Sequence, residues 1–205
     1  MVAELISVGT EILLGNIVNT NAAYLAEKCA LLGLSLYHQS VVGDNEARME
    51  DTIRRALERS DVVILTGGLG PTKDDLTKEV TAKVFKKALC EDAHTKERIM
   101  EFFQKIHNGE KITENNWKQA LIPEGAIIVE NQNGTAPGLI VIGDEGSGYE
   151  GKRAILIPGP PNECIPMFET QIAPYLSDLQ PEGIYSSMVK VCAIGESRAE
   201  TMVAD

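Results

Sequence analysis

The residues with the clearest chemical potential lie in one segment, Asp61–Thr77, with the sequence DVVILTGGLGPTKDDLT. An apolar run at Val62–Leu65 is followed at once by three glycines within residues 67–70. Glycines let backbone N–H groups approach a phosphate closely, and a helix N-terminus adds partial positive charge. The segment therefore predicts a buried strand, a phosphate-binding turn and a helix that begins near Asp75.

Two carboxylates, Asp74 and Asp75, follow this turn and cannot themselves attract a phosphate. Their presence makes sense if a divalent metal lies between carboxylate and phosphate oxygens. The turn lacks the Gly-Lys-Ser/Thr ending of a P-loop, and a dinucleotide-binding fingerprint would follow the first strand rather than a later one. The alternative is an ordinary strand-to-helix turn with Asp75 as an acid in the first helical turn.

Other polar residues follow the remaining predicted strands. The tripeptide Gly9–Glu11 comes directly after the first strand, and Asp44 follows the second, where it could lie opposite Asp75. Glu11 could bind a metal or a ligand hydroxyl, and Lys73 could neutralise a phosphate. Each residue also has an ordinary alternative role, as a helix cap, a first-turn acid or an exposed lysine.

Three further segments could line the same pocket. Asn19–Asn21 could cap a helix or offer side-chain amides to a ligand. Asn133–Gly138 places an amide, a hydroxyl and two glycines ahead of a strand, although Asn-Gly is also a common turn. Pro158–Pro161 predicts a rigid loop after a strand, and Glu163 lies at the start of the next helix.

A regular scaffold is expected to position these residues. Strands are predicted at Leu5–Val8, Leu34–Val42 and Val62–Leu65. Each precedes a segment of helical periodicity, namely Asn19 or Thr20 to Leu32, Asp44 or Asn45 to Arg59, and Asp75 to Ala88. This alternation predicts an α/β fold with a parallel sheet and helices on both faces, in which ligands bind beyond the carboxyl ends of the strands.

The second half of the chain is expected to extend this sheet. Helices are predicted at Thr95–His107, at Glu114–Gln119 and in pieces across Pro161–Leu179, and strands at Ala126–Val129, Leu139–Ile142 and Ala154–Ile157. The polar connector Gly143–Lys152 indicates a hairpin. After residue 183 a strand at Met188–Ile194 and a helix from Gly195 are expected, and they are too short to bury a core of their own.

Composition narrows the possible partners. Lys and Arg total 19 against 30 Asp and Glu, which gives a net charge of −11, and no basic run occurs. This balance argues against nucleic acid or an anionic membrane as the main partner. The cysteines Cys29, Cys90, Cys164 and Cys192 have no metal-ligand spacing and indicate reduced residues in the cytoplasm, and burial is expected for Cys29. No signal peptide or membrane-spanning run is visible.

Four motifs occur in order along the chain: GTEILLGNIVNTNAAYLA, TGGLGPTKDDLT, NGTAPG and PGPPNE. Together they resemble the N-terminal domain of the CinA (competence/damage-inducible protein) family, over about residues 1–175. That domain is similar to the molybdopterin-binding fold, so the resemblance implies a three-layer sandwich with a mostly parallel sheet. The tail VKVCAIGESRAE resembles the start of a KH-type domain, which predicts a truncated second domain at 183–205.

The resemblance also implies function. Such domains in CinA proteins are associated with metal-dependent hydrolysis of ADP-ribose to AMP and ribose 5-phosphate, whereas related cofactor-synthesis proteins bind molybdopterin and adenylylate it. The aspartates that matter in those adenylyltransferases match Asp44 and Asp75. Asp74 stands where those relatives often have Arg, which favours hydrolysis over the pterin reaction. The family also implies a homo-oligomer.

We therefore expect a cytoplasmic hydrolase of nucleotide diphosphates that uses Mg²⁺, Mn²⁺ or Co²⁺. A molybdopterin-binding or adenylyl-transferring protein and a non-catalytic nucleotide-binding module are the alternatives. Asp75, Asp44 and Lys73 are the predicted catalytic residues. Asp75, Asp44, Asp74 and Glu11 are the predicted metal ligands. The predicted ligand-binding residues are Gly9, Thr10, Glu11, Asn19, Asn21, Thr66, Gly67, Gly68, Gly70, Thr72, Thr77, Asn133, Gly134, Thr135, Pro158 and Gly159.

Overall fold

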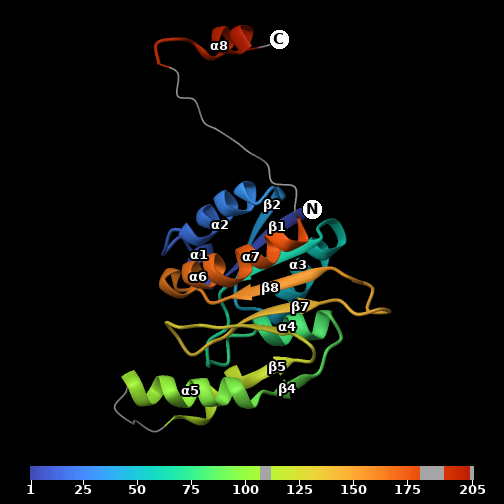
Figure 1. The fold of residues 1–205 in the computed structure, drawn as a ribbon, viewed down its shortest axis with the longest axis vertical. Coiled ribbons are helices and arrows are strands. Elements are labelled where there is room, and N and C mark those ends of the chain that lie inside the picture. The colour runs from blue at the N-terminus through green and yellow to red at the C-terminus, as the bar shows by residue number, and fades with distance from the viewer. Residues whose placement is uncertain (107–111, 181–191, 204–205) are drawn as a thin grey trace.

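The computed structural model describes residues 1–106, 112–180 and 192–203. Its centre is a six-stranded sheet with the strand order β2-β1-β3-β8-β7-β6 (Figure 1). The strands are β1 Val2–Val8, β2 Ser35–Val42, β3 Val62–Thr66, β6 Ile127–Val129, β7 Gly138–Ile142 and β8 Arg153–Ile157. Pairs among β2, β1, β3 and β8 are parallel, whereas β8–β7 and β7–β6 are antiparallel. The predicted sheet and the β7–β8 hairpin are both confirmed.

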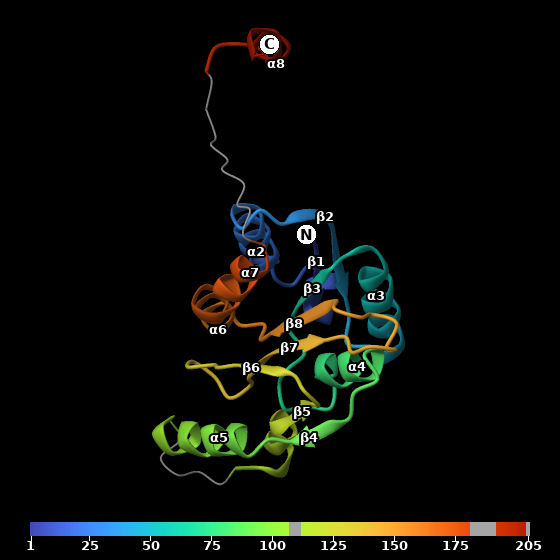
Figure 2. The same ribbon diagram turned by 45° about the vertical axis from the view of Figure 1, so that its right-hand side comes forward.

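Helices cover both faces of the sheet, as the sequence predicts. Helices α2, α6 and α7 lie on one face and α3 and α4 on the other (Figure 2). The bounds are α1 Thr10–Leu13, α2 Thr20–Leu31, α3 Glu46–Arg59, α4 Thr77–Val84, α5 Ala93–Ile106, α6 Pro161–Met167, α7 Ala173–Leu179 and α8 Glu196–Val203. A π-helix at Phe168–Ile172 joins α6 to α7, and a 3₁₀ helix spans Glu114–Ala120.

Strand β3 forms the centre of the core. Residues Val62, Val63, Ile64 and Leu65 are all fully buried, as expected for a continuous apolar run in a parallel sheet. Because side chains alternate along a strand, Val63 and Leu65 pack with α3 and α4, whereas Val62 and Ile64 pack with α2 and α6. The glycine turn therefore starts from a fully buried strand.

Two asparagines fix the starts of the first long helices. Asn19 Oδ1 accepts a hydrogen bond from the Ala22 N–H at 3.2 Å at the start of α2, and Asn45 Oδ1 accepts from the Arg48 N–H at 3.1 Å at the start of α3. Both residues were among the predicted caps. Cys29 lies fully buried on the inner face of α2, and burial raises the pKa of its thiol to about 12.

Helix α4 differs from its predicted extent of Asp75 to Ala88. It begins at Thr77 because the Asp75 carboxylate accepts hydrogen bonds from the Thr72 N–H and Oγ1, which holds residues 72–75 in a turn. The prediction that Asp75 opens the helix is therefore wrong, and Glu79 is the acid in the first turn. The helix ends before Lys86, whose φ of 56° lies in the left-handed region.

A small layer that the sequence did not predict lies at one end of the sheet. Strands β4 Leu89–Glu91 and β5 Leu121–Pro123 pair antiparallel, and α5 lies beside them (Figure 1). Neither LCE nor LIP contains the run of β-branched residues that predicts β6, which is equally short. Helix α5 starts at Ala93 rather than Thr95, because Asp92 Oδ1 accepts from the Thr95 N–H at 2.7 Å and so acts as an N-terminal cap.

The C-terminal segment is described in part. Helix α8 agrees with the helix expected after Gly195, whereas residues 192–194, the described end of the expected strand, are not in a strand. The rest of that strand, the boundary at residue 183 and His107 lie outside the described residues. No described helix is long and apolar enough to cross a membrane.

Candidate functional site

A cleft of about 870 Å³ lies where the parallel strands end. Val8 and Thr66, the last residues of β1 and β3, border it together with the loop that follows β8. The segment that precedes β7 closes another side. This is the edge at which open α/β sheets bind their ligands, and it is where the sequence analysis placed the pocket.

The cleft brings together most of the predicted site residues. It is lined by Gly9, Glu11, Asn19, Asn21, Asp44, Thr66, Gly67, Gly68, Gly70, Thr72, Asp74, Asp75, Asn133, Gly134, Thr135, Pro158 and Gly159. Thr10, Lys73 and Thr77 are not among the lining residues. Lys73 is exposed, and Thr77 is buried behind the loop, where its Oγ1 donates to the Gly67 carbonyl at 2.8 Å.

The glycine turn is held tightly against the end of β1. Gly67 and Gly68 have φ values of 94° and 66°, in the region that favours glycine. A Cβ on Gly67 would collide with the Val8 carbonyl oxygen, and one on Gly68 would collide with Thr77 Oγ1. These two positions therefore require glycine for both conformation and space.

The two predicted catalytic aspartates, Asp44 and Asp75, are each held by the backbone N–H and the hydroxyl of one threonine. Asp44 Oδ2 accepts from the Thr10 N–H at 3.1 Å and from Thr10 Oγ1 at 2.8 Å. Asp75 Oδ2 accepts from the Thr72 N–H at 2.9 Å and from Thr72 Oγ1 at 2.6 Å. Within the described residues, the Oδ1 atom of each carboxylate has no hydrogen bond. Each aspartate is therefore oriented through one oxygen and keeps the other available.

The three asparagines that were predicted to bind a ligand form hydrogen bonds within the protein. Asn19 Nδ2 donates to Ser7 Oγ at 2.8 Å, and Asn21 Nδ2 donates to the Gly159 carbonyl at 2.6 Å. Asn133 Nδ2 donates to the Asn162 carbonyl at 2.6 Å. These hydrogen bonds link neighbouring loops. The amide N–H groups therefore hold the wall of the cleft in place.

A lysine that the sequence analysis missed, Lys118, donates hydrogen bonds to the backbone of the turn at residues 72–75. Lys118 Nζ, in the 3₁₀ helix, donates to the Thr72 carbonyl at 2.9 Å and also to the Asp75 carbonyl. Lys78 lies buried beside it and donates to the Lys118 carbonyl at 2.5 Å. Burial lowers the pKa of Lys78 to about 8. The segments are far apart in sequence, so no local pattern could reveal this contact.

Glu163 is a second residue whose role was missed. It lines the cleft near the start of α6, where Asn131 Nδ2 donates to its Oε2 at 2.7 Å. Burial raises the pKa of Glu163, although the hydrogen bond from Asn131 opposes that shift. A Cβ on Gly134 would collide with this carboxylate, so a larger residue there would displace the Glu163 side chain. The sequence offered only its place in a helical first turn.

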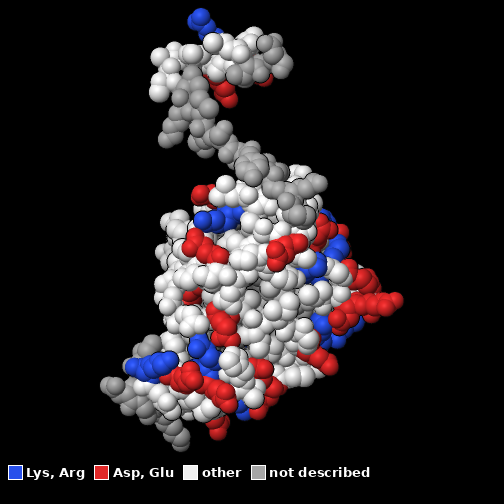
Figure 3. All heavy atoms as spheres, viewed as in Figure 1, with Lys and Arg blue, Asp and Glu red and all other residues white. Residues whose placement is uncertain are grey.

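The cleft is acidic. Five carboxylates line it, from Glu11, Asp44, Asp74, Asp75 and Glu163, and none of the described lining residues is a lysine or an arginine. On the outer face shown in Figure 3, by contrast, acidic and basic side chains are intermixed. Within the described part of the chain, no three His, Cys, Asp or Glu residues form a group that could hold a metal ion.

Known proteins share both the sequence and the fold. Residues 4–178 match the family model described as a probable molybdopterin binding domain. The chain is 51% identical over 203 residues to a competence-damage inducible protein of Caldanaerobacter subterraneus subsp. tengcongensis, a match that covers 99% of this chain and 47% of that protein. The chain thus spans about half the length of the curated relatives it matches.

Solved structures give the same result. The crystal structure of CinA from Thermoplasma acidophilum matches with a TM-score of 0.73 and 36% identity, and the match covers 84% of this chain and 97% of that one. The molybdopterin biosynthesis enzyme MoaB of Thermus thermophilus matches with a TM-score of 0.53 at 14% identity, over 89% of this chain and 98% of that one. The second similarity concerns the fold alone.

Proposed function

The chain belongs to the CinA family of competence-damage inducible proteins, and on that premise we propose that it is a metal-dependent hydrolase of nucleotide diphosphates. The proposed substrate is ADP-ribose, and the products are AMP and ribose 5-phosphate. The observation that carries the proposal is the acidic cleft bordered by the glycine turn of residues 67–70.

The charges of the cleft support a requirement for a cation. A diphosphate carries negative charge and would be repelled by the five carboxylates that line the cleft. The described lining residues offer no lysine or arginine to offset this repulsion. The backbone of the glycine turn can supply N–H donors but no full positive charge. A divalent cation is the simplest partner that satisfies both the carboxylates and the diphosphate.

The donor set fits such an ion. Carboxylate oxygens suit Mg²⁺, which is usually held by one or two carboxylates together with phosphate oxygens and water, so a group of three acids is not required. Asp44 and Asp75 each keep an oxygen without a hydrogen bond among the described residues, and Glu11 and Asp74 lie in the same lining. A bound ion would neutralise phosphate charge and lower the pKa of water.

The protein's own residues then have separate tasks. The turn at Gly67–Thr72 holds the diphosphate, and Asp44 and Asp75 would hold the divalent ion. Glu163 accepts the proton of the attacking water, since its raised pKa makes it a better base near neutral pH. The water oxygen bonds to one phosphorus, and the bond from that phosphorus to the bridging oxygen breaks. Lys73 has no part in this scheme because it lies outside the cleft lining.

Product analysis tests the proposal. The chain is incubated with ADP-ribose and Mg²⁺, Mn²⁺ or Co²⁺, with a matched sample in EDTA. AMP and ribose 5-phosphate should form in equal amounts with at least one ion. Neither product should form in the sample with EDTA. Formation of both products at the same rate in EDTA, or no product with any ion, would contradict the proposal.

A second candidate is molybdopterin binding or adenylylation. It is favoured by the match of residues 4–178 to a molybdopterin binding domain. Tight binding of molybdopterin without turnover of ADP-ribose would support it. A third candidate is a nucleotide-binding module without catalysis, for which nucleotides would raise the melting temperature but no diphosphate would be cleaved.

A further inference from the structure

Two consecutive side chains of the 3₁₀ helix hold the loop that follows the glycine turn. Lys118 Nζ donates to the Thr72 carbonyl at 2.9 Å and also to the Asp75 carbonyl. Gln119 Nε2 donates to the Leu69 carbonyl at 3.4 Å. Three carbonyl groups between residues 69 and 75 therefore accept from one short helix that lies 43 to 50 residues further along the chain.

Lys118 is itself held in place by helix α4. Lys78 is 6% exposed and donates from Nζ to the Lys118 carbonyl at 2.5 Å. Lys118 Nζ lies 3.7 Å from Glu79 Oε1, and the Lys118 side chain is only 23% exposed. Because it has partners in the loop and in α4, Lys118 is a fixed part of the structure behind the cleft and not a mobile surface lysine.

The turn at residues 72–75 is restrained from two directions. Within the turn, Asp75 Oδ2 accepts from the Thr72 N–H and Oγ1. From behind, Lys118 binds the carbonyls of the same two residues. Asp75 lines the cleft, and its Oδ1 has no hydrogen bond among the described residues. The place of this oxygen therefore depends on the geometry of the turn, which one ammonium group spans.

We propose that Lys118 is a positioning residue for the divalent ion and acts through the turn to place the Asp75 carboxylate. The assignment rests on the proposed function and deepens it. Lys118 is not among the residues that line the cleft, so it supplies no ligand atom and acts only by holding one that does. Residues that orient metal ligands commonly change metal affinity by about tenfold to a hundredfold when they are replaced.

The charge of Lys118 predicts the opposite effect from its positioning role. An ammonium group near a bound cation repels it, so by electrostatics alone the removal of Lys118 should strengthen cation binding. Loss of positioning should weaken cation binding, because Asp75 Oδ1 would no longer be held in place. The sign of the change in affinity therefore distinguishes the two effects.

Titration of the full chain with Mn²⁺ alone tests the assignment, with the free ion measured by electron paramagnetic resonance. The proteins are wild type, Lys118→Met, Lys118→Arg and Lys96→Met. Methionine removes the charge and the donors, whereas arginine keeps both. Lys96→Met is the matched control, because Lys96 Nζ lies 5.7 Å from the ring centre of Trp117 in the same 3₁₀ helix but pairs with Glu91 at 2.5 Å.

Lys118→Met should raise the dissociation constant for Mn²⁺ by about tenfold, the lower end for a residue that orients a metal ligand. Lys118→Arg should bind Mn²⁺ close to the wild-type affinity. Lys96→Met should bind it as tightly as wild type or slightly more tightly, because it only removes a positive charge. Unchanged or tighter binding by Lys118→Met would overturn the assignment. So would equal weakening by Lys96→Met, binding by Lys118→Arg as weak as by Lys118→Met, or no binding by wild type.

The number of bound ions separates positioning from a loss of folding. If Lys118→Met only unfolded some of the chains, the folded remainder would bind Mn²⁺ with wild-type affinity, and fewer ions would bind per chain. That pattern would overturn the assignment. Loss of positioning lowers the affinity and leaves the number of ions per chain at the wild-type value.

The inference and the proposed function can fail separately. Weaker Mn²⁺ binding by Lys118→Met would support the positioning role even if ADP-ribose were never cleaved. Metal-dependent cleavage of ADP-ribose by wild type, together with unchanged Mn²⁺ binding by Lys118→Met, would leave the hydrolase in place and remove Lys118 from the site.

Discussion

At the scale of single residues, the site depends on carboxylates with different surroundings. Asp44 and Asp75 are each oriented by the N–H and the hydroxyl of a threonine, which leaves one oxygen for another partner. Glu163 is half-buried, and this burial raises its pKa. Acids with different surroundings can serve different tasks in one reaction, and Glu163 is the one suited to exchange a proton.

Glu163→Gln tests the proton-transfer role. We expect kcat/KM for ADP-ribose to fall by about a hundredfold, the usual contribution of a general base. In wild type the activity should rise with pH as Glu163 ionises, at a higher pH than for an exposed glutamate because burial raises its pKa. The variant should lose this rise in its pH–rate profile.

Glu169→Gln is the matched control, because Glu169 lies outside the cleft lining and pairs with Lys28 at 3.3 Å. This control should keep both the rate and the pH dependence. A Glu163→Gln protein that keeps the wild-type rate, or that keeps the same rise in activity with pH, would exclude Glu163 as the base.

The sequence predicted these residues unequally. Asp44 and the glycines lie just after strands and Asp75 closes the glycine turn, so their place at the sheet edge follows from the strand pattern. Glu163 looked like an ordinary acid in a first turn, because its contact with Asn131 joins segments that are far apart in the sequence. The supporting contact of Lys118 is hidden for the same reason.

At the scale of elements, one buried ion pair joins the sheet to a helix. The Glu4 side chain in β1 is 1% exposed, and Arg59 at the end of α3 donates from Nε to Oε2 at 2.9 Å and from Nη2 to Oε1 at 2.7 Å. Removing the arginine would leave a buried carboxylate without its partner, which is more costly than losing an exposed pair.

Arg59→Met should lower the free energy of unfolding, because it leaves the buried Glu4 carboxylate without its ion pair. The loss is limited by the exposure of Arg59, whose side chain is 45% exposed. Arg55→Met is the control, since Arg55 and Asp51 form an exposed pair on the same helix, and it should change stability by less than about 1 kcal/mol. Urea denaturation would measure both. Equal effects would show that burial of Glu4 is unimportant.

Lys78 in α4 predicts a pH dependence of stability. Its pKa of about 8 lies below the ordinary value of 10.5, so between these values the unfolded chain binds more protons than the folded one. Stability should therefore rise with pH across that window through this residue. Lys78→Met should remove the contribution, so the stability of wild type relative to the variant should increase from pH 8 to pH 10.

Lys83→Met provides the comparison within α4, because ion pairs with Glu46 and Glu50 raise the pKa of Lys83 instead. This variant should keep the rise between pH 8 and pH 10. If wild type and Lys78→Met change in parallel over that range in urea titrations, the buried lysine does not lose its proton there.

The elements also show where sequence reasoning failed. The helices with regular apolar spacing and asparagine caps were predicted to within a few residues, because the signals are local. The start of α4 was misplaced because an aspartate can open a helix or close a turn, and Thr72 decides between them. β4 and β5 exist only through pairing between segments about 30 residues apart, which no local pattern reports.

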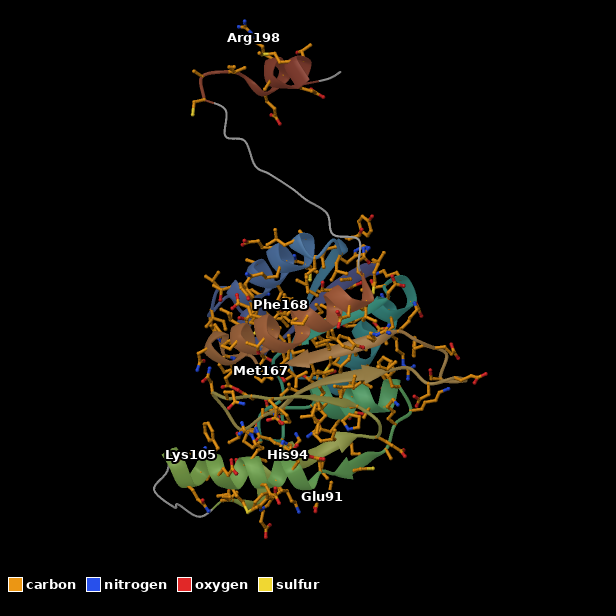
Figure 4. All side chains as sticks on the ribbon, viewed as in Figure 1. Glu91, His94, Lys105, Met167, Phe168 and Arg198 are labelled. Atoms are coloured by element: carbon orange, nitrogen blue, oxygen red, sulfur yellow. The ribbon has the colours of Figure 1, made fainter. Side chains whose placement is uncertain are left out.

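At the scale of the whole molecule, the candidate site combines two parts with different origins. The parallel sheet supplies the loops after β1, β3 and β8, which the strand–helix alternation predicts. The layer formed by β4, α5 and β5 supplies Phe102 to the cleft and Arg98 to a smaller pocket between α5 and residues 128–137. Figure 4 shows α5 with His94 and Lys105 along it, away from the helices α6 and α7.

This division explains which functional statements the sequence can support. The motifs identify the family and the sheet edge, because both depend on short segments next to strands. The small pocket between α5 and residues 128–137 depends on how these segments pack together, which is a tertiary property.

The most direct test of the central claim is the rate of ADP-ribose hydrolysis by wild type, Asp44→Asn and Asp75→Asn at several concentrations of Mg²⁺ and Mn²⁺. Asn keeps an oxygen that can accept from Thr10 or Thr72 and loses the charge. Asp178→Asn, on the exposed side of α7, is the control. We predict that kcat/KM falls by about tenfold to a hundredfold in the two cleft variants, and that these variants need a higher metal concentration to reach their full rate. Asp178→Asn should match wild type. Equal rates in all four proteins, or hydrolysis without a metal, would contradict the claim.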